Sequence, residues 1–302
     1  MTPSRTMLCL GEAVVDLIGE EHVAAIGDVR RFVSHPGGTV ANIAVVAARA
    51  GAPVGLAGGA GEDVWGRWTV ARLRAEGVDT SRFELLPGIQ TQLAFVAVDG
   101  DGEPTYVLYG EPGETVTRAL RGEERDAVGD AGGLLISSNT LAGEGEREAT
   151  MRARELALAL GRPVIFDCNL RLHRWSSAEA AAASASACVP RALLVRANRD
   201  EAELMTGESD PERAAAALCA AGARLVAITL GPGGAILRGA ARADVAAPPA
   251  DVVSSVGAGD AFTGTLVARL ALGGFKPAVA AGALPEAAMA AARACEHWGA
   301  LD

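Results

Sequence analysis

The sequence predicts an α/β fold, with a mainly parallel β-sheet, helices on both faces and a small additional β-sheet. Two observations lead to this prediction. Short strand-like runs alternate with amphipathic stretches for nearly the whole length of the 302-residue chain, and such alternation is typical of parallel sheets covered by helices. A second group of strand-like segments belongs to no strand–helix unit, which indicates a separate, smaller sheet.

The strands of the main sheet are predicted from short apolar runs, and the helices from apolar residues at helical spacing. Each predicted helix is followed by glycine, which is an expected helix stop. The predicted strands are residues 7–10, 54–57, 134–137, 163–167, 192–196 and 224–230. The predicted helices are residues 40–50, 64–76 and 145–160.

Four strand-like segments lie outside this alternation. Residues 91–98 and 105–109 flank the turn Asp-Gly-Asp-Gly and have the pattern of a β-hairpin. Residues 14–18 and 31–34 precede the first helix. Because ligands in open α/β sheets bind at the carboxyl edge of the strands, we expect segments from about 12–36 and 88–110 to form a lid there, within a single domain spanning residues 1–302.

Composition and charge argue against several classes of protein. The net charge of −10 at pH 7 argues against a nucleic-acid partner, because phosphate backbones require clustered positive charge. No apolar run approaches the ~18–20 residues that span a bilayer. The five cysteines form no C-x-x-C pair, which is typical of reduced thiols in a cytoplasmic protein. The four histidines have no metal-ligand spacing.

Lysine is nearly absent from the chain. Lys276 is the only lysine, and no G-x-x-x-x-G-K-[ST] or strand-linked G-x-G-x-x-G motif occurs. The sequence therefore lacks the P-loop and Rossmann fingerprints. We expect any side-chain cation that contacts a phosphate in this protein to be an arginine.

Residues 255–264 carry the strongest functional signal. A strand-like pair at 252–253 leads into Gly-Ala-Gly-Asp, and apolar residues at helical spacing continue to Gly273. The glycines leave room for a bulky anion near the backbone, and the free amides at a helix start favour negative charge. Asp260 in this place fits a general base, which takes the proton of a nucleophile that attacks the bound phosphate. The alternative is that Asp260 caps the helix.

Six segments resemble the motifs of the ribokinase-like (PfkB) family of carbohydrate kinases, and they run from end to end of the chain. The motifs are G-G-x-x-x-N-x-A, G-x-x-G-x-D-x-x-G, D-x-N-x-R, N-x-x-E, T-x-G-x-x-G and G-A-G-D. They are matched in this order by residues 37–44, 59–66, 167–171, 198–201, 229–234 and 257–260. Each motif is weak alone, but six in the family's order form a specific match. The resemblance implies a ribokinase-like three-layer sandwich with a small β lid.

The resemblance also implies a role for each matched residue. Asp260 would be the general base, and the transferred phosphoryl group would bind the amides of Gly257, Ala258 and Gly259. The sugar would be held by Asp16, Gly37, Gly38, Asn42 and Arg171. The ATP site would be formed by Asn198, Thr229, Gly231 and Gly234. Mg²⁺ would be organised, through water, by Asn198 and Glu201.

Several of these side chains have a structural alternative. Asp16 could end a strand or form a turn, and Asn42 could cap a helix. Glu201 could be a solvated carboxylate on a helix, as most are. Arg171 follows a predicted strand, where it is well placed to clamp a phosphate, but it could equally lie on the surface.

The choice of substrate depends on differences within the family. Thr39 and Val14 stand where ribose-specific members carry Lys and Asn, and the G-E-x-x-x-D pattern of residues 11–16 resembles fructokinases and 2-keto-3-deoxygluconate kinases. Kinases of sugar phosphates need extra cations in the pocket, and its segments offer few beyond Arg171. We therefore expect ATP-dependent phosphorylation of an unphosphorylated hexulose such as fructose.

Other functions stay open. Within the family the acceptor could be ribose, 2-keto-3-deoxygluconate or a nucleoside. The chain could also be a non-catalytic sugar- or nucleotide-binding protein, although binding alone does not require Asp260. Lid strands in this family often pair between subunits, which implies a homodimer by analogy. Ser254 stands where K⁺-activated relatives carry an Asp that helps to bind the ion, so we expect little activation by a monovalent cation.

Overall fold

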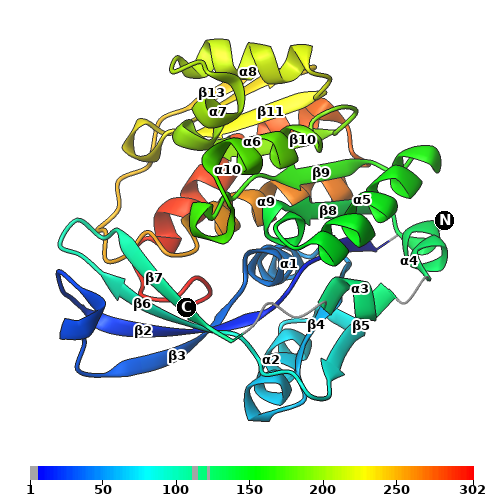
Figure 1. The fold of residues 1–302 in the computed structure, drawn as a ribbon. Helices are drawn as coiled ribbons and strands as arrows, with labels where there is room; N and C mark the ends of the chain where they lie inside the picture. Colours follow the sequence, from blue (N-terminus) through cyan, green and yellow to red (C-terminus); the bar gives the residue numbers. More distant parts are fainter. Residues whose placement is uncertain (1–5, 111–114, 121–122) are drawn as a thin grey trace.

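The main sheet has nine strands within the part of the chain that the computed structural model describes, residues 6–110, 115–120 and 123–302. Their order is β13-β12-β11-β10-β9-β8-β1-β4-β5 (Figure 1). All neighbours are parallel except β11–β12 and β12–β13, which are antiparallel. The strands are β1 (Met7–Leu10), β4 (Val54–Gly61), β5 (Asp79–Leu86), β8 (Gly133–Ser137), β9 (Val164–Asp167), β10 (Leu194–Asn198), β11 (Leu225–Thr229), β12 (Ala235–Gly239) and β13 (Ala243–Val245).

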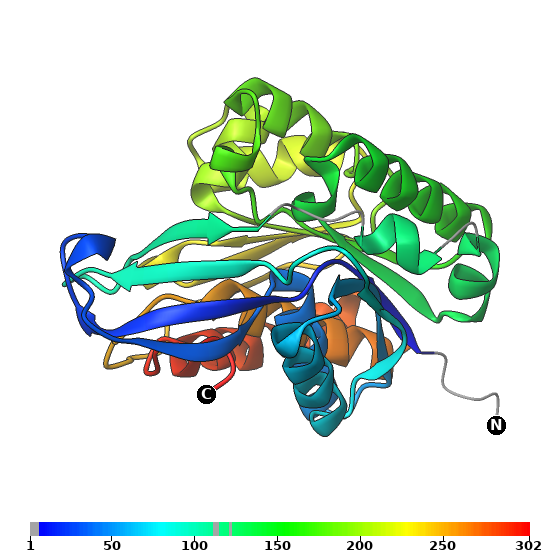
Figure 2. The same ribbon diagram turned by 60° about the horizontal axis from the view of Figure 1, so that its bottom comes forward.

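Helices cover both faces of this sheet (Figure 2). One face carries α1 (Thr39–Arg49), α2 (Val64–Ala75), α9 (Ala258–Leu272) and α10 (Pro277–Ala294). The other carries α3 (Thr115–Leu120), α4 (Glu124–Asp130), α5 (Glu144–Ala159), α6 (Ala178–Ser186), α7 (Arg199–Thr206) and α8 (Pro211–Ala220). Successive strand residues enter opposite cores, as Leu225 and Val226 do. This burial on both faces explains the continuous apolar runs of the strands and confirms the predicted fold class.

The second sheet has the order β3-β2-β6-β7 and projects from the main body (Figure 1). Its strands are β2 (Val14–His22), β3 (Phe32–Gly37), β6 (Leu93–Val98) and β7 (Pro104–Tyr109). The predicted hairpin is present as the antiparallel pair β6–β7, and β2 pairs with β3 antiparallel and with β6 parallel. Residues of β2, β6 and β7 line the same cavity as the residues that follow β9 and β10.

Some local predictions were wrong. The strands β5, β12 and β13 were not predicted, because they lie at or near the sheet edges and mix polar with apolar residues. Residues 252–253 form no strand. The N–H groups of Val253 and Ser254 instead donate to the carbonyl of Cys295, at 2.8 and 3.1 Å, so the end of α10 supplies the acceptor that a neighbouring strand would have provided. Within the described residues, no helix combines the length and apolar character needed to cross a membrane.

Candidate active site

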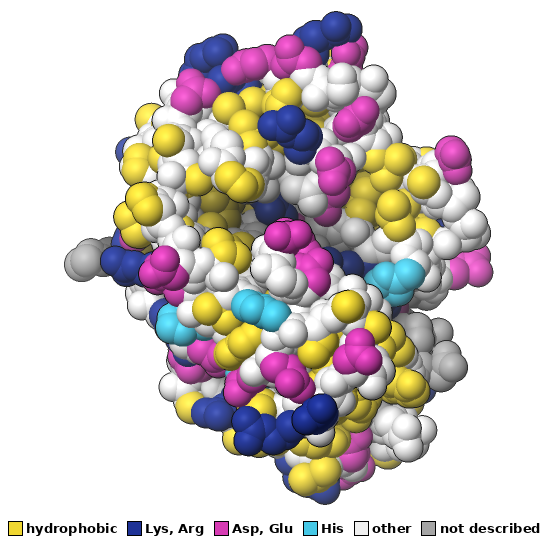
Figure 3. Space-filling view, turned by 90° about the vertical axis from the view of Figure 1, so that its left-hand side faces the viewer, with side chains coloured by type: hydrophobic (Ala, Val, Ile, Leu, Met, Phe, Trp, Pro, Cys, Tyr) yellow, Lys and Arg dark blue, Asp and Glu magenta, His cyan; other side chains and the backbone are white. Residues whose placement is uncertain are grey.

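Two cavities meet at the carboxyl edge of the main sheet. The first, which we call the polar cavity, measures about 580 Å³ and lies between the second sheet, the loops after β9 and β10, and the start of α9. The second, the apolar cavity, measures about 470 Å³ and lies between the loop after β11 and α10. Four residues line both cavities: Glu103, Arg196, Ser255 and Gly259. Figure 3 shows the hollow on this face of the molecule, with basic side chains in it.

The chain enters α9 through a turn that requires small residues. Gly257 has a φ of 78°, and a Cβ at this position would lie 2.3 Å from the Cβ of Ala300. Gly257 is also the N-cap of α9, and no side chain caps this helix. Gly257, Gly259 and Asp260 line the polar cavity, while Ala258 lines the apolar cavity. All four residues of the predicted anion site therefore lie where the cavities meet.

Asp260 is held by one specific partner, the side chain of Asn42 on α1. The Nδ2 of Asn42 donates to the Oδ2 of Asp260 at 2.8 Å. Burial raises the pKa of Asp260 to about 7, against the opposing effect of this hydrogen bond, and a carboxylate with a near-neutral pKa suits a general base. The N-caps of α9 and α1 are Gly257 and Gly38, so neither Asp260 nor Asn42 is a helix cap.

Asp16 lies on β2, where it is buried and lines the polar cavity. Burial and the negative charge of Asp260 raise the pKa of Asp16 to about 7, while Arg171 acts in the opposite sense. A Cβ at Gly37 would lie 2.4 Å from the Asp16 carboxylate, so Gly37 supports this side chain from behind and does not line the polar cavity. Gly38, with a φ of 96°, does line it.

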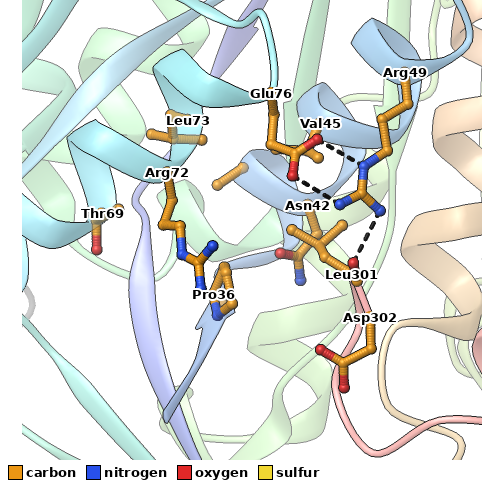
Figure 4. Close-up of a pocket in the computed structure, with 12 residues that line it drawn as sticks. Pro36, Asn42, Val45, Arg49, Thr69, Arg72, Leu73, Glu76, Leu301 and Asp302 are labelled. Atoms are coloured by element: carbon orange, nitrogen blue, oxygen red, sulfur yellow. Dashed lines mark hydrogen bonds and ion pairs between the residues drawn. The ribbon is translucent and has the colours of Figure 1, made fainter.

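A smaller cavity of about 110 Å³ lies on the far side of Asn42, between α1 and α2 (Figure 4). Arg49 on α1 pairs with Glu76, with 2.7 Å between Nε and Oε2, and its Nη1 donates to the carbonyl of Leu301 at 2.9 Å. These bonds attach the C-terminal residues to α1. The helix that carries Asn42 is therefore held in place from the side opposite the polar cavity.

Two arginines on the loop after β9 reach the polar cavity. The guanidinium of Arg171 lies 5.0 Å from the ring centroid of Tyr106 on β7, which is a cation–π contact between the loop and the second sheet. Arg174 pairs with Glu12 at 3.1 Å, and both line the cavity. The cavity thus holds more positive charge than the sequence indicated.

The two predicted Mg²⁺ residues form a capping box at the start of α7. Asn198 Oδ1 accepts the N–H of Glu201, and Glu201 Oε2 accepts the N–H of Asn198, both at 2.8 Å. Glu201 is buried, so it is not a solvated helix carboxylate, and burial raises its pKa. Its second oxygen, Oε1, accepts the N–H of Leu170 at 2.7 Å.

Asn198 and Glu201 offer the oxygen ligands that Mg²⁺ prefers. Both Asn198 and Glu201 line the polar cavity, and each carboxylate oxygen keeps acceptor capacity beyond one hydrogen bond. Mg²⁺ commonly takes one or two carboxylates together with waters and substrate phosphates. Residues 6–110, 115–120 and 123–302 contain no cluster of three or more His, Cys, Asp or Glu that could hold a metal by themselves. The residues present therefore fit a water-mediated ion and not a closed protein cage.

The predicted nucleotide loop lies on the apolar cavity. Thr229, Gly231 and Gly234 all line it, facing alanines of α10. Gly234 has a φ of 87°, and a Cβ there would lie 2.0 Å from the carbonyl oxygen of Val245. Only glycine allows this close approach, so the loop shape depends on it. Small apolar walls suit a planar apolar group such as a nucleotide base.

Arg196 on β10 had no predicted role, yet it lies at the centre of the site. Its Nη2 donates to Thr229 Oγ1 at 2.9 Å, and its Nη1 lies 3.6 Å from Asp167 Oδ1. Asp167 also accepts a hydrogen bond from the hydroxyl of Thr263 on α9. The sequence does contain a signal for Arg196: it is an arginine inside the apolar run Leu-Leu-Val-Arg-Ala. A charged side chain within a buried strand needs a partner or a ligand.

Comparison with known proteins identifies the family of this chain. Residues 4–299 match the description pfkB family carbohydrate kinase, and the chain belongs to this family. It is 30% identical over 273 residues to fructokinase-1 of Oryza sativa subsp. japonica, which covers 88% of this chain and 83% of that protein. It is 31% identical over 274 residues to 5-dehydro-2-deoxygluconokinase of Shouchella clausii (strain KSM-K16), with coverages of 88% and 83%.

Solved structures agree with this assignment. A double mutant of fructokinase from Vibrio cholerae O395, in a fructose-, ADP- and potassium ion-bound form, matches with a TM-score of 0.85 and 27% identity, covering 99% of this chain and 94% of that one. Fructokinase from the same organism, bound to fructose, ADP and calcium ion, matches with the same TM-score and identity, covering 99% and 95%. The ribokinase-like fold and the fructokinase-like branch of the family, both predicted from the motifs, are confirmed.

Proposed function

We propose that the protein transfers the γ-phosphoryl group of ATP to a hydroxyl of an unphosphorylated sugar, a six-carbon ketose such as fructose. One observation carries the proposal: the Asp260 carboxylate, with a pKa near 7, lies beside an uncapped helix start at the meeting point of the two cavities. A non-catalytic binding protein would not need a base at that point. Membership in the carbohydrate kinase family and the fructokinase relatives support the reaction and the acceptor.

In the proposed reaction the sugar occupies the polar cavity and ATP the apolar cavity. Asp260 takes the proton of the sugar hydroxyl, whose oxygen forms a bond to the γ-phosphorus. The bond from this phosphorus to the oxygen that bridges to the β-phosphate breaks, and ADP leaves with the electron pair. The amides of residues 257–259 hold the transferred group, and Asn42 keeps the base oriented.

The remaining predicted residues bind and orient the two substrates. Asp16, Gly38 and Arg171 face the sugar in the polar cavity, while Thr229, Gly231 and Gly234 shape the nucleotide loop. Mg²⁺ held through water by Asn198 and Glu201 would neutralise charge on the phosphates.

One observation favours a second acceptor class, a sugar acid. Arg171 and Arg174 both line the polar cavity, and guanidinium groups pair readily with carboxylates. The relative from Shouchella clausii is a 5-dehydro-2-deoxygluconokinase. Ribose, 2-keto-3-deoxygluconate and nucleosides remain the other acceptors to compare.

An ADP-release assay over a panel of acceptors tests the proposal. The panel is fructose, tagatose, ribose, adenosine, 2-keto-3-deoxygluconate and 5-dehydro-2-deoxygluconate. We expect the highest kcat/KM with fructose. A higher value with a sugar acid, lost selectively in Arg171→Met, would establish the second class. No ADP release above the background of ATP alone, with any acceptor, would contradict the kinase function.

We also propose that the protein forms a homodimer through the second sheet. Its edge strand β7 exposes Val107 and Tyr109, by 37% and 59%, and an apolar edge strand offers unpaired backbone groups to a second copy. Light scattering should give twice the monomer mass, and Tyr109→Lys should lower it. A monomeric wild type at assay concentration would contradict the dimer. A cytoplasmic location stays a prediction from the scattered cysteines.

A further inference from the structure

Arg196 is a buried guanidinium whose hydrogen-bonding capacity is largely unused. The residue is 7% exposed. Its Nη2 bonds to Thr229, but Nη1 stays 3.6 Å from Asp167 Oδ1, which is an ion-pair separation longer than a hydrogen bond. Its Nε has no partner among the described residues. Unpaired buried donors are costly, so these N–H groups point to a ligand.

The guanidinium lies where that ligand would have to cross between the cavities. Arg196 lines both the polar and the apolar cavity. A Cβ at Gly259 would lie 2.9 Å from Nη2 and 3.0 Å from Nη1, so the guanidinium is in direct contact with the backbone of the anion site. A side chain at position 259 would therefore displace this cation from its present place.

Arg196 is positively charged, because a guanidinium does not deprotonate in proteins. Asp167 shares its carboxylate between Arg196 and the hydroxyl of Thr263, so this counter-ion is fixed in place and only partly compensates the guanidinium. No lysine lines either cavity.

We propose that Arg196 is a catalytic residue that contacts the γ-phosphoryl group as it passes from the apolar to the polar cavity, and that it stabilises the charge that develops there. This inference rests on the proposed kinase function. A planar guanidinium donates to two phosphoryl oxygens at once. Donors that are already in place at the developing charge are the main source of catalysis in phosphoryl transfer.

The first test compares Arg196→Met and Arg196→Lys with the wild type. We expect kcat of Arg196→Met to fall at least about 100-fold, the usual effect of removing one such donor, with the KM for the sugar changed by less than about threefold. Arg196→Lys should recover part of this loss, because it keeps the charge but not the planar fork.

Binding of a phosphoryl mimic separates this role from a structural one. In calorimetry, the complex of ADP with aluminium fluoride should bind Arg196→Met more weakly by a factor close to the loss in kcat. Binding of ADP alone should change by less than about threefold. In addition, the positive charge of Arg196 lowers the pKa of Asp260, so the acid limb of kcat/KM should move to higher pH in Arg196→Met.

A matched control is Arg238→Met. Arg238 is also a buried arginine of the same sheet, held by Glu212 and Asp244, but it lines neither cavity. We expect it to lower stability while kcat stays within about threefold of the wild type. If Arg196→Met does not fold because Asp167 is left as an unpaired buried charge, the double variant Arg196→Met/Asp167→Asn removes both charges and should show the same loss of kcat.

A kcat within about threefold of the wild type in folded Arg196→Met would overturn the inference. Equal weakening of ADP and of its aluminium fluoride complex would overturn it as well. If the wild type phosphorylated none of the acceptors, the proposed function would fail, and the difference between the two ADP complexes would still decide whether Arg196 binds a phosphoryl group.

Discussion

The two cavities that meet at Arg196 differ in chemical character. The polar cavity is lined by charged side chains from strand ends, loops and the second sheet, among them Asp16, Asp260 and Arg171. The apolar cavity has mostly small or apolar lining residues, from the loop after β11, residues 247–252, the start of α9 and α10. A charged pocket can move protons and orient a polar substrate, whereas an apolar slot binds a planar group by burial.

In the proposed reaction, proton transfer and nucleotide affinity therefore depend on different elements of the fold. Substitutions in the polar cavity should change kcat and its pH dependence, and substitutions in the apolar cavity should change the KM for ATP.

Asp260→Asn should lower kcat at least about 100-fold, because the sugar hydroxyl loses its general base. The KM values for sugar and ATP should stay within about threefold, since the amide keeps the shape of the carboxylate. Steady-state kinetics measures both, and Asp251→Asn, an exposed acid on the preceding loop that lines neither cavity, is the control. A near-normal kcat of Asp260→Asn would mean that Asp260 is not the general base.

The kcat/KM for the sugar should fall about tenfold per pH unit below about pH 7. Burial raises the pKa of both Asp260 and Asp16 to about 7, so these carboxylates take up protons, and the base is lost, as the pH falls through that value. The charge of Asp260 raises the pKa of Asp16. The apparent pKa on the acid side of the pH profile therefore belongs to the two carboxyl groups together. A pH profile that stays flat well into the acid range would contradict these raised pKa values.

Ala291→Phe on α10 should raise the KM for ATP about tenfold, because the added ring would fill part of the apolar cavity. A tenfold change corresponds to a loss of about 1.4 kcal/mol of binding free energy. The KM for the sugar should not change. Met289→Phe, on the same helix but 41% exposed and outside the cavity, is the control. An effect of Ala291→Phe on the sugar instead of ATP would reverse the assignment of the two cavities.

Amide hydrogen exchange should slow by roughly threefold or more in residues 93–109 when the sugar is added without ATP. The reason is that β6 and β7 line the polar cavity, and closure of a lid over bound sugar orders its strands. The hairpin β12–β13 should not respond, because none of its residues lines this cavity. Equal exchange with and without saturating sugar would show that the second sheet does not close.

Turnover should differ by less than about twofold between K⁺ and a bulky organic cation, because the site lacks the carboxylate that offsets dehydration of the ion. Ser254 is fully buried, and its hydroxyl accepts the N–H of Val256 at 3.1 Å. Ser254→Asp should introduce K⁺ dependence. Activation of the wild type by K⁺ of about tenfold would contradict this prediction, because it would mean that neutral oxygens alone can bind the ion.

Six strands of the main sheet (β1, β4, β8, β9, β10 and β11) and the anion site could be predicted from the sequence, because their signals are local. A strand buried on both faces is a continuous apolar run whatever surrounds it. Gly257, Gly259 and Asp260 are adjacent in the chain, so one turn of α9 brings them together. The hairpin β6–β7 is likewise specified by its own turn.

The strands β5 and β13 and the partners of the site residues were decided only by the tertiary structure. Edge strands are partly exposed, so their sequences carry no clear apolar pattern. Asn42 and Asp260 are 218 residues apart and meet because α1 and α9 pack on the same face of the sheet. Arg196 reaches the anion site because β10 lies between β9 and β11. Local patterns determine most of the strands that are buried on both faces, whereas the order of strands in the sheet determines which of their ends share a cavity.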